Sequence, residues 1–197
     1  MNQPTSDSAQ ERALIARARA GDESAFGQLV TEHSARVQGA LRRFGLNPEE
    51  ADEVAQEVFL RAWRGLAGFQ ERARFSTWLY RIAFNEAQRS LARRAPAASL
   101  CAPDDENAIG ALPDASGAGP QARTLDREFE RELDRALAEL PADLRAAVVL
   151  RDLEGLSTEE AANVAGVREA ALKSRLHRGR MQLRALLEPY LRLERAG

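Results

Sequence analysis

The chain has 197 residues, of which 44% are hydrophobic, and its formal net charge is −2 at pH 7. That hydrophobic fraction can form a core, so wholesale disorder is excluded, and the near-neutral charge by itself indicates no nucleic-acid partner. With one cysteine, Cys101, neither a disulfide framework nor a cysteine metal site can form within one chain. No apolar run approaches about 18 residues and the N-terminus resembles no signal sequence, which predicts a cytoplasmic protein without membrane insertion.

The average charge conceals a segregation along the chain. Residues 49–57 hold five carboxylates and no basic residue, whereas residues 61–94 hold eight arginines and two glutamates. Residues 168–197 hold eight basic residues and three glutamates. Blocks of this kind indicate separate faces for separate partners, although each block taken alone fits a solvated helix face equally well.

The first half of the chain predicts four helices. They cover about residues 8–20, 22–44, 47–65 and 75–93. Asp22 and Asn47 are good N-caps, Pro48 suits a first helical position, and Gly45 suits the end of the second helix. A loop is expected at 65–74.

The composition changes after the fourth helix. Residues 95–122 are rich in Pro, Gly, Ala and Asp without periodicity, which predicts a linker. Four further helices are expected beyond it, at about 125–140, 141–154, 158–165 and 168–188. Ser157 and Glu160 have capping-box spacing, and Pro189 is expected to stop the last helix.

Residues 157–180 have the pattern of a helix-turn-helix. Small residues such as Ala161 and Ala162 suit a helix crossing, Gly166 permits the turn, and Leu172 and Leu176 fall on one face of the second helix. The other face carries the polar and basic residues Lys173, Ser174, Arg175, His177, Arg178 and Arg180. Such a face can enter a DNA major groove, and the alternative is a helical hairpin with a solvated basic face.

Aromatic and basic residues alternate over residues 69–94. Phe69, Phe75, Trp78 and Tyr80 stand among Arg72, Arg74, Arg81 and Arg89. Rings that stack on bases and guanidinium groups that follow phosphates favour single-stranded DNA. The alternative is that these rings form core; for Trp78 the two interpretations are equally supported, whereas the loop position of Arg72 and Arg74 favours binding.

Residues 52–64 begin with acidic residues and continue as a predicted helix with several apolar positions. Its apolar positions include Val58, Phe59, Leu60 and Trp63. This is more apolar surface than one small bundle needs, which indicates a protein partner. Periodicity alone favours core plus a polar face, so both interpretations stay open.

Four segments, in this order and spacing, resemble the extracytoplasmic-function sigma factors: DEVAQEVFLRAW, FSTWLYRIAFNEAQR, ALAELPADLRAAVVLRDLEGLSTEEAA and KSRLHRGR. The resemblance implies an all-α protein with two small helical domains. Residues 1–94 would be sigma region 2, residues 95–121 a flexible linker, and residues 122–197 the sigma region 4 helix-turn-helix.

The resemblance also implies partners and site residues. The segment that binds core RNA polymerase, at the β′ clamp helices, would use Asp52, Gln56, Glu57, Phe59, Leu60 and Trp63. With the aromatic and basic segment above, the −10 DNA set is Phe69, Gln70, Arg72, Arg74, Trp78, Arg81 and Asn85. With the polar face above, the −35 DNA set is Arg168, Lys173, Ser174, Arg175, His177 and Arg178. The second domain would also contact the β flap, and an anti-sigma factor would be a further partner.

Two positions depart from the family pattern. Ala170 and Ala171 stand where a Gly-Thr pair usually opens the recognition helix, so that helix is expected to begin earlier, near Val167. Gly179 stands where alanine is usual, and glycine inside a helix costs about 1 kcal/mol relative to alanine.

The predicted function is promoter-specific transcription initiation together with core polymerase, by binding and not by catalysis. His33 and His177 are far apart, and neither a glycine-rich phosphate loop nor metal-ligand spacing occurs, so no enzyme and no cofactor is expected. One alternative is an autonomous helix-turn-helix regulator that acts without polymerase. Another is a sigma-like protein that has lost its activity and works through protein contacts.

Overall fold

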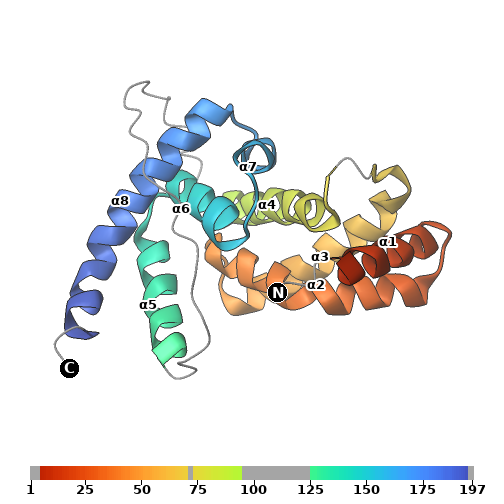
Figure 1. Cartoon of the computed structure of the whole chain (residues 1–197), viewed down its shortest axis with the longest axis horizontal. Helices are drawn as coiled ribbons and strands as arrows, with labels where there is room; N and C mark the ends of the chain where they lie inside the picture. The colour runs from red at the N-terminus through yellow and green to blue at the C-terminus, as the bar shows by residue number, and fades with distance from the viewer. Residues whose placement is uncertain (1–4, 71–72, 95–124, 195–197) are drawn as a thin grey trace. The chain divides into compact units, whose positions relative to one another are not determined.

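A computed structural model of the chain describes residues 5–70, 73–94 and 125–194 (Figure 1). All regular elements in these ranges are helices, which confirms the all-α prediction. The predicted linker, Arg72 and Cys101 lie outside the described residues. In the described part of the chain, no helix is long and apolar enough to cross a membrane.

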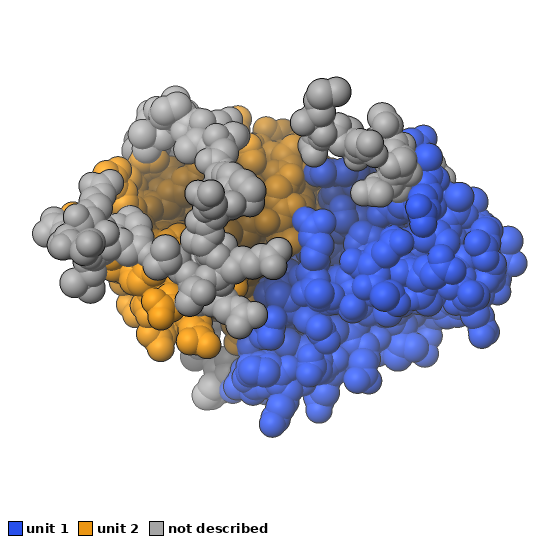
Figure 2. Space-filling view, turned by 60° about the horizontal axis from the view of Figure 1, so that its bottom comes forward, with its two compact units in different colours: residues 1–42, 46–96 blue, residues 43–45, 97–197 orange. Residues whose placement is uncertain are grey.

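The chain divides into two compact units, coloured separately in Figure 2. The N-terminal unit comprises residues 1–42 and 46–96, and the C-terminal unit comprises residues 43–45 and 97–197. The expectation of two helical domains is therefore confirmed.

The N-terminal unit is built from four helices and one short 3-10 turn. These are α1 (Thr5–Arg19), α2 (Glu23–Arg43), α3 (Pro48–Gly65), η1 (Leu66–Gly68) and α4 (Phe75–Arg94). Helix α3 packs against α4, and η1 contacts α1 and α3. Residues from α1 to α4 share one core, in which Leu29, Leu66 and Leu79 are almost fully buried.

Local capping explains where α2 and α3 begin. Gly21 turns the chain with a φ of +92°, and the Asp22 side chain accepts a hydrogen bond of 3.0 Å from the Ala25 N–H. At α3, the Asn47 side chain accepts from the Glu50 N–H at 2.9 Å, and the Glu50 carboxylate accepts from the Asn47 N–H at 3.0 Å. Both predicted N-caps are confirmed.

In the described part of the C-terminal unit, α5 and three shorter helical segments pack around a long last helix. Its elements are α5 (Leu125–Glu139), α6 (Ala142–Val148), the π-helical turn η2 (Val149–Leu153), α7 (Thr158–Ala165) and α8 (Glu169–Glu194). Helix α8 packs against α5, α6 and α7. The predicted capping box of α7 is present, with Ser157 and Glu160 bonded reciprocally at 3.1 and 2.8 Å. Gly166 ends α7 in the left-handed region with a φ of +68°, which favours glycine.

One expectation for α8 is wrong. The helix begins at Glu169, with the Leu172 N–H donating to the Arg168 carbonyl at 3.0 Å, which is before Ala170 and Ala171 as expected and within two residues of Val167. Contrary to expectation, the helix continues through Pro189 to Glu194. A proline removes one hydrogen bond, but packing of this last part against α5, where the Tyr190 and Phe129 rings are 6.1 Å apart, favours continuation.

Gly179 has a packing role that its helix propensity does not indicate. The residue is buried where α8 meets α6. A β-carbon there would lie 2.8 Å from the Val148 Cγ2 atom and 3.1 Å from the Leu144 carbonyl oxygen. The two helices therefore approach each other through a glycine.

Candidate functional site

An open groove lies between α2 and α3 of the N-terminal unit. Its volume is about 750 Å³, and its apolar lining includes Phe26, Val30, Phe59, Leu60 and Trp63. The Phe26 and Trp63 rings pack at 4.9 Å between centroids, and the Leu60 side chain is 49% exposed. Polar residues complete the lining: Glu23, Ser34, Gln38, Asp52 and Gln56. An apolar strip with polar side chains around it is the usual composition of a protein-binding surface.

The structure brings together five of the six residues predicted to bind polymerase. Asp52, Gln56, Phe59, Leu60 and Trp63 all line the groove, because spacings of three and four residues share one helix face. The Gln38 amide donates to the Asp52 carboxylate at 3.1 Å and so links α2 to α3.

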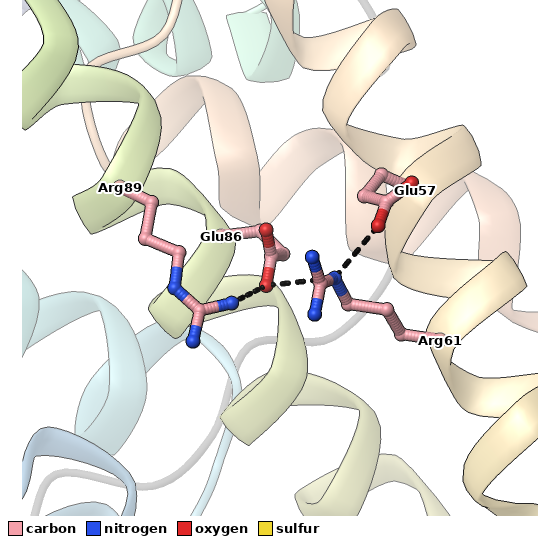
Figure 3. A network of polar contacts seen from close by, with 4 residues as sticks. All are labelled: Glu57, Arg61, Glu86 and Arg89. Carbon is pink, nitrogen blue, oxygen red and sulfur yellow. Dashed lines mark hydrogen bonds and ion pairs between the residues drawn. The ribbon is translucent and has the colours of Figure 1, made fainter.

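Glu57, the sixth residue, belongs instead to a polar network between α3 and α4 (Figure 3). Its carboxylate lies 2.7 Å from Arg61 Nε, and the same Nε lies 3.0 Å from Glu86 Oε1. Arg89 donates to that Glu86 oxygen at 2.5 Å. The Glu86 side chain is only 9% exposed, so two guanidinium groups compensate a buried carboxylate and tie the two helices together.

Three aromatic rings form a cluster where η1 leads into α4. Phe69 lies 5.7 Å from Phe75 and 5.1 Å from Trp78, measured between ring centroids. His33 packs edge-on against Phe75 at 5.3 Å and forms a 3.0 Å contact with Glu11. Phe69 and Phe75 are buried and Trp78 is partly exposed. Phe69 therefore supports the loop from the core and does not present its ring to solvent in this structure.

The remaining described residues of the −10 set lie at the surface. Gln70, Arg74, Arg81 and Asn85 are exposed. Arg74 directly precedes α4, and its carbonyl accepts from the Trp78 N–H at 3.1 Å. Spacings of three and four residues then place Trp78, Arg81 and Asn85 along one face of α4. The structure thus joins one partly exposed ring, two guanidinium groups and an amide in a continuous stripe.

Helix α8 presents most of the −35 set on its exposed side. Arg168, Lys173 and Arg178 are exposed, and Ser174 and His177 are partly exposed. Lys173 Nζ lies 3.8 Å from Glu169 across one helical turn. Arg175 differs: its side chain is 19% exposed and its Nε lies 3.6 Å from the Asp143 carboxylate on α6.

Sequence reasoning missed three acidic residues that organise these surfaces. Glu86 holds Arg61 and Arg89, Asp143 lies beside Arg175, and Asp152 accepts two hydrogen bonds from Arg180 at 2.9 and 2.6 Å. Arg61, Arg175 and Arg180 stand on other elements than their acidic partners, so no local spacing indicates these pairs. Among the described residues, no group of His, Cys, Asp or Glu is arranged to hold a metal ion.

Comparison with known proteins gives matches along nearly the whole chain. Residues 29–96 match the Sigma-70 region 2 family, and residues 130–183 match the Sigma-70, region 4 family. The chain is 38% identical to the RNA polymerase sigma-H factor of Pseudomonas aeruginosa, over 93% of this chain and 96% of that protein. It is 34% identical to the ECF RNA polymerase sigma-E factor of Escherichia coli K12, over 92% and 96%.

A solved structure is similar over the same extent. It is the structure of CnrH in complex with the cytosolic domain of CnrY, with a TM-score of 0.65 and 30% identity over 91% of this chain and 98% of that one. Both sigma-70 regions are present in order, and the relatives are matched over almost their full lengths. The chain therefore belongs to the extracytoplasmic-function sigma factors of the sigma-70 family.

Proposed function

We propose that this sigma factor joins core RNA polymerase and directs it to promoters by reading the −35 element as duplex and the −10 element as melted single strand. Members of the family are transcription initiation factors without catalytic activity. The observation that carries the proposal is the separation of surfaces: an apolar groove and a basic, aromatic stripe on one unit, and a basic helix on the other. Residues 1–94 and 122–197 are the proposed domains, joined by residues 95–121.

The groove is the proposed polymerase-binding surface. Leu60 and Trp63 are large apolar side chains with exposed area, and such residues contribute most of the binding free energy at interfaces. By family resemblance, the partner is the clamp-helix segment of the β′ subunit. Glu57 contributes through its contact with Arg61, which orients α3 against α4.

The stripe on α4 is the proposed −10 surface. Arg74 and Arg81 can neutralise phosphates, Trp78 offers part of a ring for stacking, and Asn85 offers an amide to a base edge. Unpaired bases held in this way are favoured over the duplex, and the contacts offset the few kcal/mol that unstacking costs. Gln70 and the predicted residue Arg72 would complete the set.

Helix α8 is the proposed −35 reader. Its exposed side carries Lys173, Ser174, His177 and Arg178, which suits a major groove with phosphate contacts at its edges. Arg168, directly before the helix, is a proposed contact to the DNA backbone. The second unit would also contact the β flap, as the family resemblance implies.

A protein inhibitor is the proposed regulator of this sigma factor. CnrH, the similar solved protein, was determined in complex with the cytosolic domain of CnrY. An anti-sigma factor that covers the groove would compete directly with polymerase, because both would bind the apolar strip around Leu60.

One selection tests the proposal. The full chain is mixed with bacterial core RNA polymerase and a random promoter library, open-complex DNA is recovered, and a parallel selection omits polymerase. The proposal predicts enrichment only with polymerase, of a −10 and −35 pair at fixed spacing. Enrichment of a duplex site without polymerase would favour an autonomous regulator, and enrichment in neither arm would indicate an inactive relative.

A further inference from the structure

Two arginines border the buried face of α8, one on each side. Leu172, Leu176 and Gly179 form that face. At about 100° per residue, Arg175 and Arg180 stand about 140° apart around the helix, with Leu176 between them. Both arginines therefore lie at the boundary between the buried and the exposed surface of α8.

Each of these arginines meets an acid on a different neighbouring element. Arg180 donates from Nε to Asp152 Oδ2 at 2.9 Å and from Nη2 to Asp152 Oδ1 at 2.6 Å, a bidentate pair with η2. Arg175 Nε lies 3.6 Å from Asp143 Oδ2 on α6. The hydrogen-bonded Arg180–Asp152 pair thus fixes one edge of the buried face, and Asp143 lies near the other.

Two cations outside the buried face behave differently. Lys173 and Arg178 are exposed on the remaining surface of α8, where the proposed DNA contacts lie. Arg180 is seven residues after Lys173, which is about 20° from it around the helix. A released Arg180 would therefore reach the same DNA strand region that Lys173 faces.

We propose that Asp152 is a positioning residue: it holds Arg180 against η2, fixes the rotation of α8 about its axis, and excludes Arg180 from the phosphate contacts. This rests on the proposed −35 role of α8 and revises it, because the set of DNA-contacting cations is smaller than the sequence suggests. The ligand concerned is the phosphate backbone of duplex DNA.

A mutant cycle on the full chain tests the positioning role. The affinity of four proteins, each assembled with core polymerase, for a labelled duplex that carries the selected −35 element is measured against KCl concentration: wild type, D152N, R180Q and D152N/R180Q. Each phosphate contact contributes about 0.9 to the slope of log K against log salt. We expect equal slopes for wild type and R180Q, a slope steeper by about 0.9 for D152N, and the wild-type slope again for the double variant.

Two control variants separate this effect from a change in net charge or helix content. E130Q removes an exposed carboxylate of α5 and should leave the slope unchanged. D152E keeps a carboxylate and should keep the wild-type slope. Circular dichroism checks that each variant keeps its helical content.

Three results would overturn the inference. A slope that falls by about 0.9 in R180Q alone would mean that Arg180 already contacts a phosphate. A D152N slope equal to that of E130Q would mean that Asp152 does not keep Arg180 from the phosphate contacts. Failure of all four proteins to bind the duplex at low salt after assembly with core polymerase would remove the DNA role of α8. Assembly with core polymerase, measured separately on native gels, tests the sigma proposal itself whatever these slopes show.

Discussion

Gly179 of α8 and Val148 of α6 approach so closely that a β-carbon on the glycine would lie 2.8 Å from the valine Cγ2 atom. The same β-carbon would lie 3.1 Å from the Leu144 carbonyl oxygen, which cannot rotate away. The position of the proposed reading helix on α6 therefore depends on the absence of a side chain at residue 179.

Replacing this glycine should destabilise the C-terminal unit. Gly179→Ala gains about 1 kcal/mol of helix propensity, but overpacking of a well-packed contact typically costs about 1–3 kcal/mol. We expect a net loss of about 1 kcal/mol in urea unfolding. In a Val148→Ala background the same change should cost less, because only the close contact with the Leu144 carbonyl oxygen remains. Equal effects in the two backgrounds would show that Val148 is not the obstacle.

Leu60 should contribute to polymerase binding without contributing to the fold. Its side chain is 49% exposed on the groove, so Leu60→Ala should leave the thermal transition of the free protein unchanged. Loss of an apolar interface contact of about 1–2 kcal/mol weakens affinity about five- to thirty-fold. Met181→Ala is the matched control, because Met181 is 51% exposed in the other unit. Equal loss of affinity in both variants, measured by fluorescence titration with core polymerase, would argue against the groove.

Asn85 and Arg81 should act on melted DNA in different ways. Arg81→Ala should weaken binding of a −10 single strand to holoenzyme and reduce the salt slope by about 0.7, the value for one contact on single-stranded DNA. Asn85→Ala should weaken binding with the slope unchanged, because an amide neutralises no phosphate. Arg36→Ala, an exposed arginine of α2, serves as control. Identical salt slopes for Arg81→Ala and wild type would remove Arg81 from the DNA surface.

Glu86 should stabilise the N-terminal unit. Removal of its buried carboxylate would leave Arg61 with Glu57 alone and would take the Glu86 partner from Arg89. Because both arginines are partly exposed, we expect Glu86→Ala to cost about 1–3 kcal/mol in urea unfolding. Glu53→Ala, an exposed position on α3, should cost little. A Glu86 variant as stable as the Glu53 variant would show that the network carries no net stability.

The Asp22 cap should make the stability of the first two helices depend on pH in the acid range. A hydrogen bond from the Ala25 N–H, and then Arg17, lower the pKa of Asp22 below its ordinary value. Because the pKa is lower in the folded protein, the ionised carboxylate stabilises the fold at pH values above the pKa of the unfolded state. This contribution is lost as pH falls through the pKa of the folded state. Asp22→Asn should therefore flatten the fall in melting temperature on acidification. An unchanged acid dependence would contradict this role.

The parts of the fold predicted from sequence are those that depend on nearby residues. The capping boxes at Asn47 and Ser157 join groups three residues apart, so the local sequence alone indicates them. The groove residues of α3 recur at helical spacing, and that spacing alone places them on one face of the helix. The two-domain division follows from the change of composition after α4.

What sequence could not predict depends on contacts between distant elements. Glu57 neighbours Gln56 in the chain, yet it lies about 100° away around α3 and meets Arg61, whose Nε also contacts Glu86 on α4. Pro189 signals a helix end, but packing of α8 on α5 overrides it. Arg175 and Lys173 both carry a positive charge, and only the fold shows that Arg175 lies beside Asp143.

Promoter melting is the most direct test of the account. Permanganate modifies unpaired thymines, so its reaction with a selected promoter reports opening of the −10 element. We predict reactive −10 thymines when this chain and core polymerase are both present, and unreactive ones with either alone. Thymines that stay unreactive with both, in a complex shown to contain polymerase, chain and DNA, would contradict the claim that this protein opens promoters.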